Sequence, residues 1–257
     1  MIQIQKRKVG KYRMKNEIIV VSDPKSPEAE VFRNLRTNIQ FMNTDSTKKV
    51  MLVTSTVPGE GKSYVTANLA AAFAQMDKRV LIIDADMRKG RQYKVFNIKS
   101  RPGISNFLSG VTEQDFFKDK ENIFNYIQET DVKNLFVITA GNVPPNPSEL
   151  IISNKLKSAT NSLIAKFDVI IFDAPPALIV TDALLLVRLV DFTVLVTSQN
   201  ETRIENLVKA KTSIENVGGK IAGIVLNKVK IASKSYYKKT YYYEDKSSFS
   251  GKPKRRK

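Results

Sequence analysis

Short, uninterrupted apolar runs alternate along the chain with segments in which apolar residues follow a helical spacing. The apolar runs do not alternate polar with apolar positions, which is typical of parallel strands buried on both faces of a sheet. These runs predict strands at Val50–Ser55, Val80–Asp84, Leu135–Thr139, Val169–Asp173, Phe192–Thr197 and Ile221–Asn227. The segments between them predict helices at Pro27–Phe41, Lys62–Met76, Ile104–Leu108, Pro147–Ala165, Asp182–Leu189 and Arg203–Val217.

The alternation of strands and helices predicts an α/β fold, in which a doubly wound, mostly parallel sheet carries helices on both faces. We expect one folded domain at residues 16–231, preceded by a basic segment at 1–15. The pattern dissolves into Ser, Lys and Tyr near the end, so residues 232–257 are predicted to be a flexible tail. No apolar run approaches the roughly 20 residues that span a bilayer, and the prediction is a cytoplasmic protein.

The first predicted strand continues into a glycine-bearing turn and then into an Ala-rich helix. This turn, residues 54–63, reads Thr-Ser-Thr-Val-Pro-Gly-Glu-Gly-Lys-Ser, the pattern of the phosphate-binding loop of P-loop NTPases. In such a loop the main-chain amides face the phosphates, Lys62 reaches the outer phosphates and the Ser63 hydroxyl binds Mg²⁺. Thr56 departs from the strict pattern, which has glycine there. The predicted ATP-binding residues are Pro58, Gly59, Glu60, Gly61, Lys62, Ser63, Tyr64 and Asn227.

Acidic residues follow two further predicted strands at the point where each strand ends. Asp84 and Asp86 follow Val80–Ile83, and Asp173 follows Val169–Phe172. Because ligands of open parallel sheets bind beyond the carboxyl ends of the strands, these carboxylates are expected to meet the phosphate-binding loop. Carboxylates so placed hold Mg²⁺ opposite a phosphate chain, so Ser63, Asp86 and Asp173 are the predicted metal ligands. The predicted catalytic residues are Asp84, Asp86, Lys62 and Arg88; the spacing does not decide whether Asp84 or Asp86 is the base.

The net charge of +17 is concentrated at the two ends of the chain. Residues 1–15 carry six Lys and Arg without an acid, and residues 228–257 carry eleven against two acids. On charge alone, such ends fit an anionic membrane surface, a nucleic acid or a solvated tail. The chain has neither His nor Cys, which excludes catalytic triads built on His and metal sites built on thiolates.

Five of the nine tyrosines fall within eight residues of the tail: Tyr236, Tyr237, Tyr241, Tyr242 and Tyr243. Their neighbours are lysines and acids, so burial in a core explains them poorly. Composition alone does not decide their role: such aromatic and basic segments can bind other proteins or single-stranded nucleic acid. Beside an ATP site, they become candidate acceptors of a phosphoryl group.

Taken together, these motifs resemble the bacterial tyrosine kinases of capsule and exopolysaccharide biosynthesis, in the stand-alone cytoplasmic form of Gram-positive bacteria. The resemblance covers roughly residues 16–245. It is carried by the phosphate-binding loop, Asp-Ala-Asp-Met-Arg at 84–88, Ile-Ile-Phe-Asp at 170–173, Pro-Pro-Asn-Pro-Ser-Glu-Leu at 144–150 and the tyrosine cluster. The segment Glu-Val-Phe-Arg-Asn-Leu-Arg at 30–36 is similar to the one with which the family builds a ring-shaped oligomer, which implicates Glu30, Arg33 and Arg36.

The resemblance implies an ATP- and Mg²⁺-dependent kinase that phosphorylates its own tail tyrosines, mainly between subunits, and regulates polysaccharide synthesis. It also implies a membrane-embedded activator acting through its cytoplasmic tail, recruitment to the inner face of the membrane and a cognate tyrosine phosphatase. No specific nucleic acid is expected. The alternative is an ATPase switch of the cell-division or plasmid-partition type. Those proteins carry an additional lysine five residues before the loop lysine, where this chain has Val57.

Overall fold

The computed structural model describes residues 17–42, 49–111, 119–199 and 201–229. The basic segment 1–15 and the tyrosine cluster at 236–243 lie outside the described residues.

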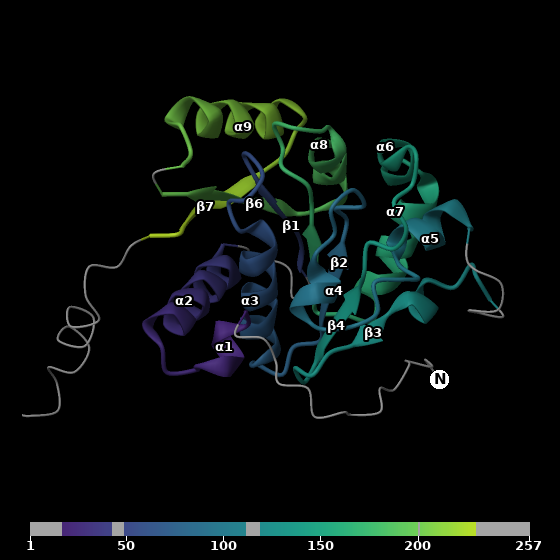
Figure 1. Ribbon diagram of the computed structural model, residues 1–257, viewed down its shortest axis with the longest axis horizontal. Coiled ribbons are helices and arrows are strands. Elements are labelled where there is room, and N and C mark those ends of the chain that lie inside the picture. Colours follow the sequence, from purple (N-terminus) through teal and green to yellow (C-terminus); the bar gives the residue numbers. More distant parts are fainter. Residues whose placement is uncertain (1–16, 43–48, 112–118, 200, 230–257) are drawn as a thin grey trace, which may run out of the picture.

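Within the described residues, seven strands form one sheet in the order β3–β4–β2–β5–β1–β6–β7 (Figure 1). All neighbours pair in parallel except β3, which runs antiparallel to β4. The predicted α/β fold with a mostly parallel sheet is therefore confirmed. The strands are β1 (Lys49–Ser55), β2 (Val80–Asp84), β3 (Gln128–Glu129), β4 (Leu135–Ile138), β5 (Val169–Asp173), β6 (Phe192–Ser198) and β7 (Ile221–Asn227).

Helices cover both faces of the sheet, as Figure 1 shows, and each face has its own apolar core. On one face α1 (Ile19–Ser22), α2 (Pro27–Phe41) and α3 (Lys62–Ala74) pack against alternate side chains of the central strands. The other face carries α5 (Ile104–Ser109), the 3₁₀ turn η1 (Ile123–Tyr126), α6 (Pro147–Ile151), α7 (Asn154–Ile164), α8 (Asp182–Leu186), η2 (Val187–Leu189) and α9 (Ile204–Asn216). Strands β1, β2, β5 and β6 are buried throughout, which explains their continuous apolar sequences.

Helix α2 begins and ends where the sequence pattern predicts. The Ser26 hydroxyl accepts a hydrogen bond of 3.1 Å from the Ala29 amide, and Pro27 occupies the first helical position. Glutamates 28 and 30 lie in the first turn, where the helix dipole favours negative charge. At the other end of the chain, Gly218 closes α9 with a φ of 85°, a conformation that glycine adopts at no steric cost.

One predicted helix is wrong: Pro147–Ala165 is two helices, α6 and α7. The Ser153 hydroxyl accepts a hydrogen bond from the Leu156 amide and begins the second helix, because a serine side chain competes for main-chain donors. Four short elements were not predicted: α1, η1 and α4 (Gln92–Val95), each of four residues, and the two-residue strand β3. A single turn carries too little periodicity to be recognised. No helix in the described part of the chain has the length and apolar character to cross a membrane.

Candidate active site

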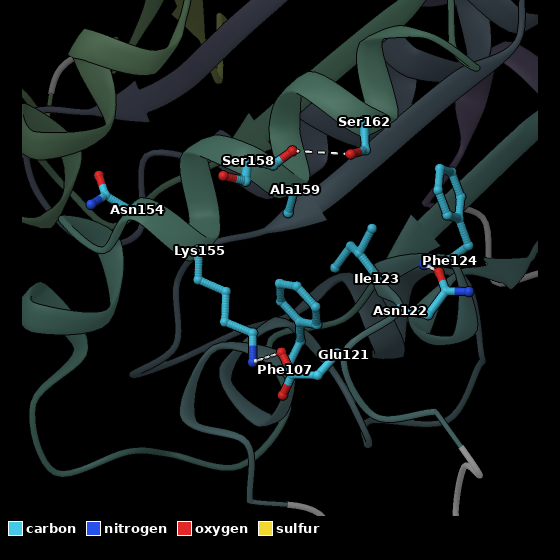
Figure 2. A pocket seen from close by; sticks show the side chains of 10 residues that line it. All are labelled: Phe107, Glu121, Asn122, Ile123, Phe124, Asn154, Lys155, Ser158, Ala159 and Ser162. Carbon is cyan, nitrogen blue, oxygen red and sulfur yellow. Dashed lines mark hydrogen bonds and ion pairs between the residues drawn. The ribbon is translucent and has the colours of Figure 1, made fainter.

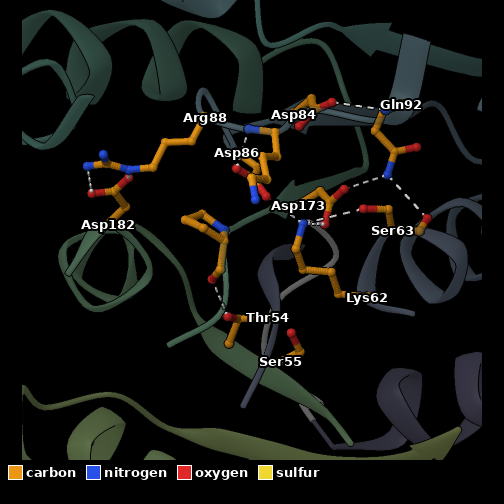
Figure 3. A network of polar contacts seen from close by, with 12 residues as sticks. Thr54, Ser55, Lys62, Ser63, Asp84, Asp86, Arg88, Gln92, Asp173 and Asp182 are labelled. Atoms are coloured by element: carbon orange, nitrogen blue, oxygen red, sulfur yellow. Dashed lines mark hydrogen bonds and ion pairs between the residues drawn. The ribbon is translucent and has the colours of Figure 1, made fainter. Parts of the chain in front are cut away.

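The strand register brings the two predicted acidic motifs together. Asp84 ends β2 and Asp173 ends β5, and the two residues are direct partners in the parallel ladder. On the other side of β5, Val53 of β1 pairs with Asp173, two residues before the strand ends at Ser55 and passes into the phosphate-binding loop. The expected meeting of loop and carboxylates at one sheet edge is therefore observed (Figure 3).

The ammonium of Lys62 lies among the oxygens predicted to bind a metal. Its Nζ is 2.9 Å from Asp86 Oδ2, 3.4 Å from Asp173 Oδ1 and 3.4 Å from Ser63 Oγ. Burial disfavours the charge, but Asp173, Asp86 and Asp84 outweigh it and raise the pKa of Lys62 above its usual value. Two carboxylates and one hydroxyl around one cation are a donor set that fits Mg²⁺, which takes one or two carboxylates together with phosphate and water. Within the described residues no three carboxylates gather into a metal site of their own.

Asp84 is fully buried, and its two oxygens differ. Oδ2 accepts a hydrogen bond of 2.9 Å from the Gln92 amide, whereas Oδ1 has no hydrogen-bond partner in the described part of the structure. Burial, reinforced by the negative charge of Asp173, raises the pKa of Asp84 to about 8. A raised pKa on a carboxyl at the edge of the sheet is a mark of a functional group.

Gln92 connects all three motifs and was missed by the sequence analysis. Its side-chain Nε2 donates to Asp173 Oδ2 at 2.7 Å and to the Ser63 carbonyl at 3.2 Å, and its main-chain amide binds Asp84. The side chain, whose hydrogen bonds are drawn in Figure 3, is completely buried. No sequence signal could identify it, because a single glutamine after an acidic motif has no characteristic spacing.

Glu60 stabilises the phosphate-binding loop from inside. Its buried carboxylate accepts hydrogen bonds from the Thr56 amide at 2.7 Å, the Thr56 hydroxyl at 2.6 Å and the Val57 amide at 3.0 Å. The Thr202 hydroxyl, from the segment after β6, donates to the same carboxylate. Thr56, the irregular residue of the loop, thus supplies a donor that glycine lacks. Because the Glu60 side chain is hydrogen-bonded to the loop itself, only the main chain of Glu60 is available for the predicted nucleotide contact.

The two glycines of the loop have left-handed conformations, with φ of 89° at Gly59 and 92° at Gly61. A Cβ on Gly59 would meet nothing within 4 Å, so the exposed side of the loop is open, and Pro58 beside it is exposed. A Cβ on Gly61 would lie 2.1 Å from the amide nitrogen of Asn227, which donates to the Glu60 carbonyl at 2.9 Å. Asn227, at the end of β7, therefore packs directly on the loop.

The first turn of α3 offers main-chain donors to an anion. The first intrahelical bond runs from Val65 N to Gly61 O, so the amides before Val65 have no partner within the helix. Lys62, Ser63 and Tyr64 supply these amides. The Tyr64 ring packs against Phe32 of α2 with a centroid separation of 5.8 Å, so its main chain is the part that faces the loop. An open loop and free helical amides fit a nucleotide phosphate chain.

Arg88 points away from the carboxylates toward α8 (Figure 3). Its Nε donates to Asp182 Oδ2 at 2.9 Å, and the Ser148 hydroxyl donates to Asp182 Oδ1 at 2.7 Å. Hydrogen bonding to buried Asp182 raises the pKa of Arg88 further. Arg88 is 40% exposed, so its guanidinium also faces solvent beside the site. The sequence analysis missed both Asp182 and Ser148.

The predicted oligomerisation residues make contacts within the chain. Arg33 pairs with Glu30 at 2.7 Å on the surface of α2. Arg36 Nη1 donates to the Ala72 carbonyl in the last turn of α3 at 2.9 Å, while its buried Nε has no hydrogen-bond partner in the described part of the structure. Burial and the neighbouring Arg33 lower the pKa of Arg36. Arg36 is thus partly committed to the α2–α3 contact.

A cavity of about 560 Å³ lies between η1 and α7, and none of the predicted site residues lines it (Figure 2). Lys155 points into it, pairs with Glu121 at 2.7 Å and lies 4.7 Å from the centre of the Phe107 ring. The cavity is separate from the strand ends that carry the candidate chemistry.

The fold and the loop together define a nucleotide-binding protein of the P-loop NTPase class. A family model described as "ParA: NUBPL iron-transfer P-loop NTPase" matches residues 46–252. The kinase domain of the Escherichia coli tyrosine kinase ETK superposes with a TM-score of 0.78 at 30% identity, covering 89% of this chain and 85% of that chain.

Two similar proteins have nearly the same length as this chain. Tyrosine-protein kinase YwqD of Bacillus subtilis is 38% identical over 240 residues, which are 93% of this chain and 96% of that protein. Putative tyrosine-protein kinase CapB of Staphylococcus aureus is 41% identical over 226 residues, 88% of this chain and 94% of that protein. This chain belongs to the bacterial tyrosine-kinase family, within the P-loop NTPases of the ParA type.

Proposed function

We propose that the chain is an ATP- and Mg²⁺-dependent protein-tyrosine kinase that phosphorylates the tyrosine cluster at 236–243 of other copies of itself. The observation that carries the proposal is the convergence of Lys62, Asp84, Asp86 and Asp173 at one sheet edge in a member of the tyrosine-kinase family. The tail supplies five acceptor hydroxyls.

The residues divide the chemistry between binding and proton transfer. The main-chain amides of the loop and of the first turn of α3 bind the phosphates of ATP, and Lys62 stabilises the charge that develops between the β- and γ-phosphates. Mg²⁺, when bound through Ser63, Asp86 and Asp173, neutralises phosphate charge. The γ-phosphoryl group passes to the phenol oxygen, and the phenol proton passes to Asp84.

The raised pKa of Asp84 suits this role. A phenol has a pKa near 10, so the ionised form of a carboxyl whose pKa is about 8 accepts the proton against a smaller free-energy difference than an ordinary aspartate does. Asp84 is fully buried, so a tyrosine hydroxyl reaches it only after the residues that cover it move. Asp86, which pairs with Lys62, is the other carboxylate that could take the proton. Arg88, which pairs with Asp182 and is partly exposed, would contact the acceptor or its phosphate.

We further propose that Glu30, Arg33 and Arg36 contribute to a ring-shaped homo-oligomer in which the tail of one subunit reaches the site of another. The partners would be a membrane-embedded activator, acting through its cytoplasmic tail, and a tyrosine phosphatase. The activator and the basic ends would hold the enzyme at the inner face of the membrane, where it regulates capsular or exopolysaccharide synthesis. The support for these points is the family membership and the charge of the ends.

Phosphotyrosine mapping tests the kinase assignment. The purified protein, supplied with the cytoplasmic tail of a candidate activator, is incubated with Mg²⁺ and ATP, and its tail is analysed by mass spectrometry. We expect phosphate on Tyr236–Tyr243 in the wild type and none with Lys62→Met. Lys157→Met, which removes an exposed lysine from α7, is the matched control and should label normally. Asp84→Asn and Asp86→Asn, compared side by side, identify the base.

The ATPase-switch alternative gives a different result. ATP hydrolysis without phosphate on the tail, in the presence of the activator, would refute the kinase proposal and favour the switch. Tail phosphorylation that persists in Lys62→Met would mean that the phosphate-binding loop does not bind the ATP used in the reaction.

A further inference from the structure

A groove of about 600 Å³ adjoins the candidate active site and is strongly basic. It lies between the loop after β2, helix α4, residues 100–101 and the loop after β4. Its walls contain no Asp or Glu, and all of them belong to the described part of the chain. The cations that line it are Arg88, Lys89, Arg91, Lys94 and Arg101.

Most of this charge is not balanced by the protein. Arg88 pairs with Asp182, which lies outside the groove lining. Among the described ion pairs, none involves Lys89, Arg91 or Lys94, and all three side chains are exposed. Like charges around a concavity focus a positive potential that attracts an anion. The groove is therefore built for a negatively charged group.

The groove shares a wall with the candidate base. Gly90 lines it, and a Cβ on Gly90 would lie 2.9 Å from Asp84 Oδ2 and 2.5 Å from the Cβ of Ala140. The segment that carries Arg91 and Lys94 also includes Gln92, whose amide binds Asp84. Only Gly90 therefore separates Asp84 from the groove at this point. A phosphate newly attached to a tyrosine at Asp84 would form next to the basic groove.

We propose that this groove binds phosphotyrosine in the tyrosine cluster of a second copy of the chain, and so retains a partly phosphorylated tail at the site. The inference rests on the proposed kinase function, because that activity generates the ligand. Retention lets the remaining tyrosines of the same tail react before it dissociates.

The tail sequence matches the charge of the groove only after phosphorylation. Residues 236–245 contain two lysines and two acids, so the unmodified segment carries no net charge. Each phosphate adds about −1.5 to −2 charges at neutral pH. Arginine binds phosphate through two parallel hydrogen bonds, and the Tyr93 ring in the groove wall offers a surface for a second aromatic ring. An extended polyanion such as a nucleic acid needs a longer basic track than one pocket of this volume.

Peptide binding tests the proposal without ATP. Fluorescent peptides of residues 234–246, unmodified or carrying phosphate on Tyr241, are titrated by anisotropy into the full-length, dephosphorylated protein. We expect the phosphorylated peptide to bind at least tenfold more tightly. Arg91→Ala with Lys94→Ala should abolish this difference, whereas Arg91→Lys with Lys94→Arg should keep it. Lys157→Ala in α7 with Lys166→Ala in the turn after it removes the same charge and should leave this difference within twofold of the wild type.

Several outcomes would overturn the proposal. These are equal affinity for the two peptides, a preference that survives Arg91→Ala with Lys94→Ala, or equally tight, Arg91-dependent binding of a single-stranded oligonucleotide or an anionic vesicle. The last result would make the groove a general polyanion surface.

The proposed kinase function and the proposed groove binding can be tested independently of each other. If tail phosphorylation is absent but the phosphopeptide is selected by the groove, the proposed function fails and the groove assignment stands. If both hold, limiting ATP should give the wild type a mixture of unmodified and multiply phosphorylated tails. Arg91→Ala with Lys94→Ala should then accumulate singly phosphorylated tails.

Discussion

Gln92 Nε2 donates a hydrogen bond of 2.7 Å to Asp173 Oδ2, which links the start of α4 to the end of β5 inside the candidate site. The same nitrogen contacts the Ser63 carbonyl, and the main-chain amide of Gln92 contacts Asp84. One uncharged residue, through its side chain and its main-chain amide, thus links the phosphate-binding loop and the two acidic motifs.

Replacing Gln92 with Leu should therefore impair both catalysis and stability. The substitution leaves a buried carboxylate oxygen and a buried carbonyl without their donor, which costs about 1–3 kcal/mol each in stability and misplaces Asp173. We expect tail phosphorylation to fall about tenfold to a hundredfold, while the affinity for ADP changes less than fivefold. Initial rates of phosphorylation and calorimetric titration with ADP measure the two effects.

The control for this change is Gln40→Leu, which alters a partly exposed glutamine of α2 outside the network. It should leave both quantities near the wild-type values. A Gln92→Leu protein of normal activity would show that Asp173 holds its position without this hydrogen bond.

Asp84 should make the stability of the metal-free protein depend on pH. Its pKa is raised from 3.8 to about 8 by burial and by Asp173, so the folded state holds a proton that the unfolded state has released. Between about pH 4 and pH 8 the folded state binds more protons, and stability falls as the pH rises through this window. Above pH 8 the loss is complete.

Asp84→Asn removes this titration. In EDTA, the melting temperature of Asp84→Asn should exceed that of the wild type by several degrees at pH 8 and by much less at pH 5, since 1 kcal/mol corresponds to about 2–4 °C in a domain of this size. A constant offset for Asp84→Asn across the range would contradict the raised pKa.

Glu60 should control the affinity of the loop for nucleotide. In Glu60→Ala, three donors of Thr56 and Val57 lose their common acceptor, and the loop is no longer held in a single conformation. We expect ADP to bind about tenfold more weakly, equivalent to about 1.4 kcal/mol. Glu201→Ala, which removes an exposed glutamate bonded to Ser198 and Lys228, is the control and should bind ADP normally. Unchanged affinity in Glu60→Ala would mean that the glycines alone define the loop.

The sequence predicted what local patterns encode and missed what depends on tertiary contacts. The six predicted strands follow from apolar runs, helix α2 follows from the helical spacing of its apolar residues, and the meeting of Asp84 with Asp173 follows from parallel strand ends. Gln92 and Asp182 could not be found, because their roles arise from contacts across 81 and 94 residues of sequence. The inward role of Glu60 was missed for a related reason: a loop motif describes main-chain spacing and does not say where a carboxylate points.

Lys62 offers a direct test of the metal assignment, because its ammonium lies among the oxygens of Ser63, Asp86 and Asp173. In Lys62→Met these oxygens lose their cation, and two buried carboxylates then repel each other. Mg²⁺ alone should therefore raise the melting temperature of Lys62→Met by several degrees more than that of the wild type, in which the metal competes with the ammonium. Adding Asp86→Asn to Lys62→Met should remove most of this gain, because it deletes one ligand and much of the repulsion. Equal shifts in Lys62→Met and the wild type would instead show that these oxygens do not bind the metal without nucleotide phosphates.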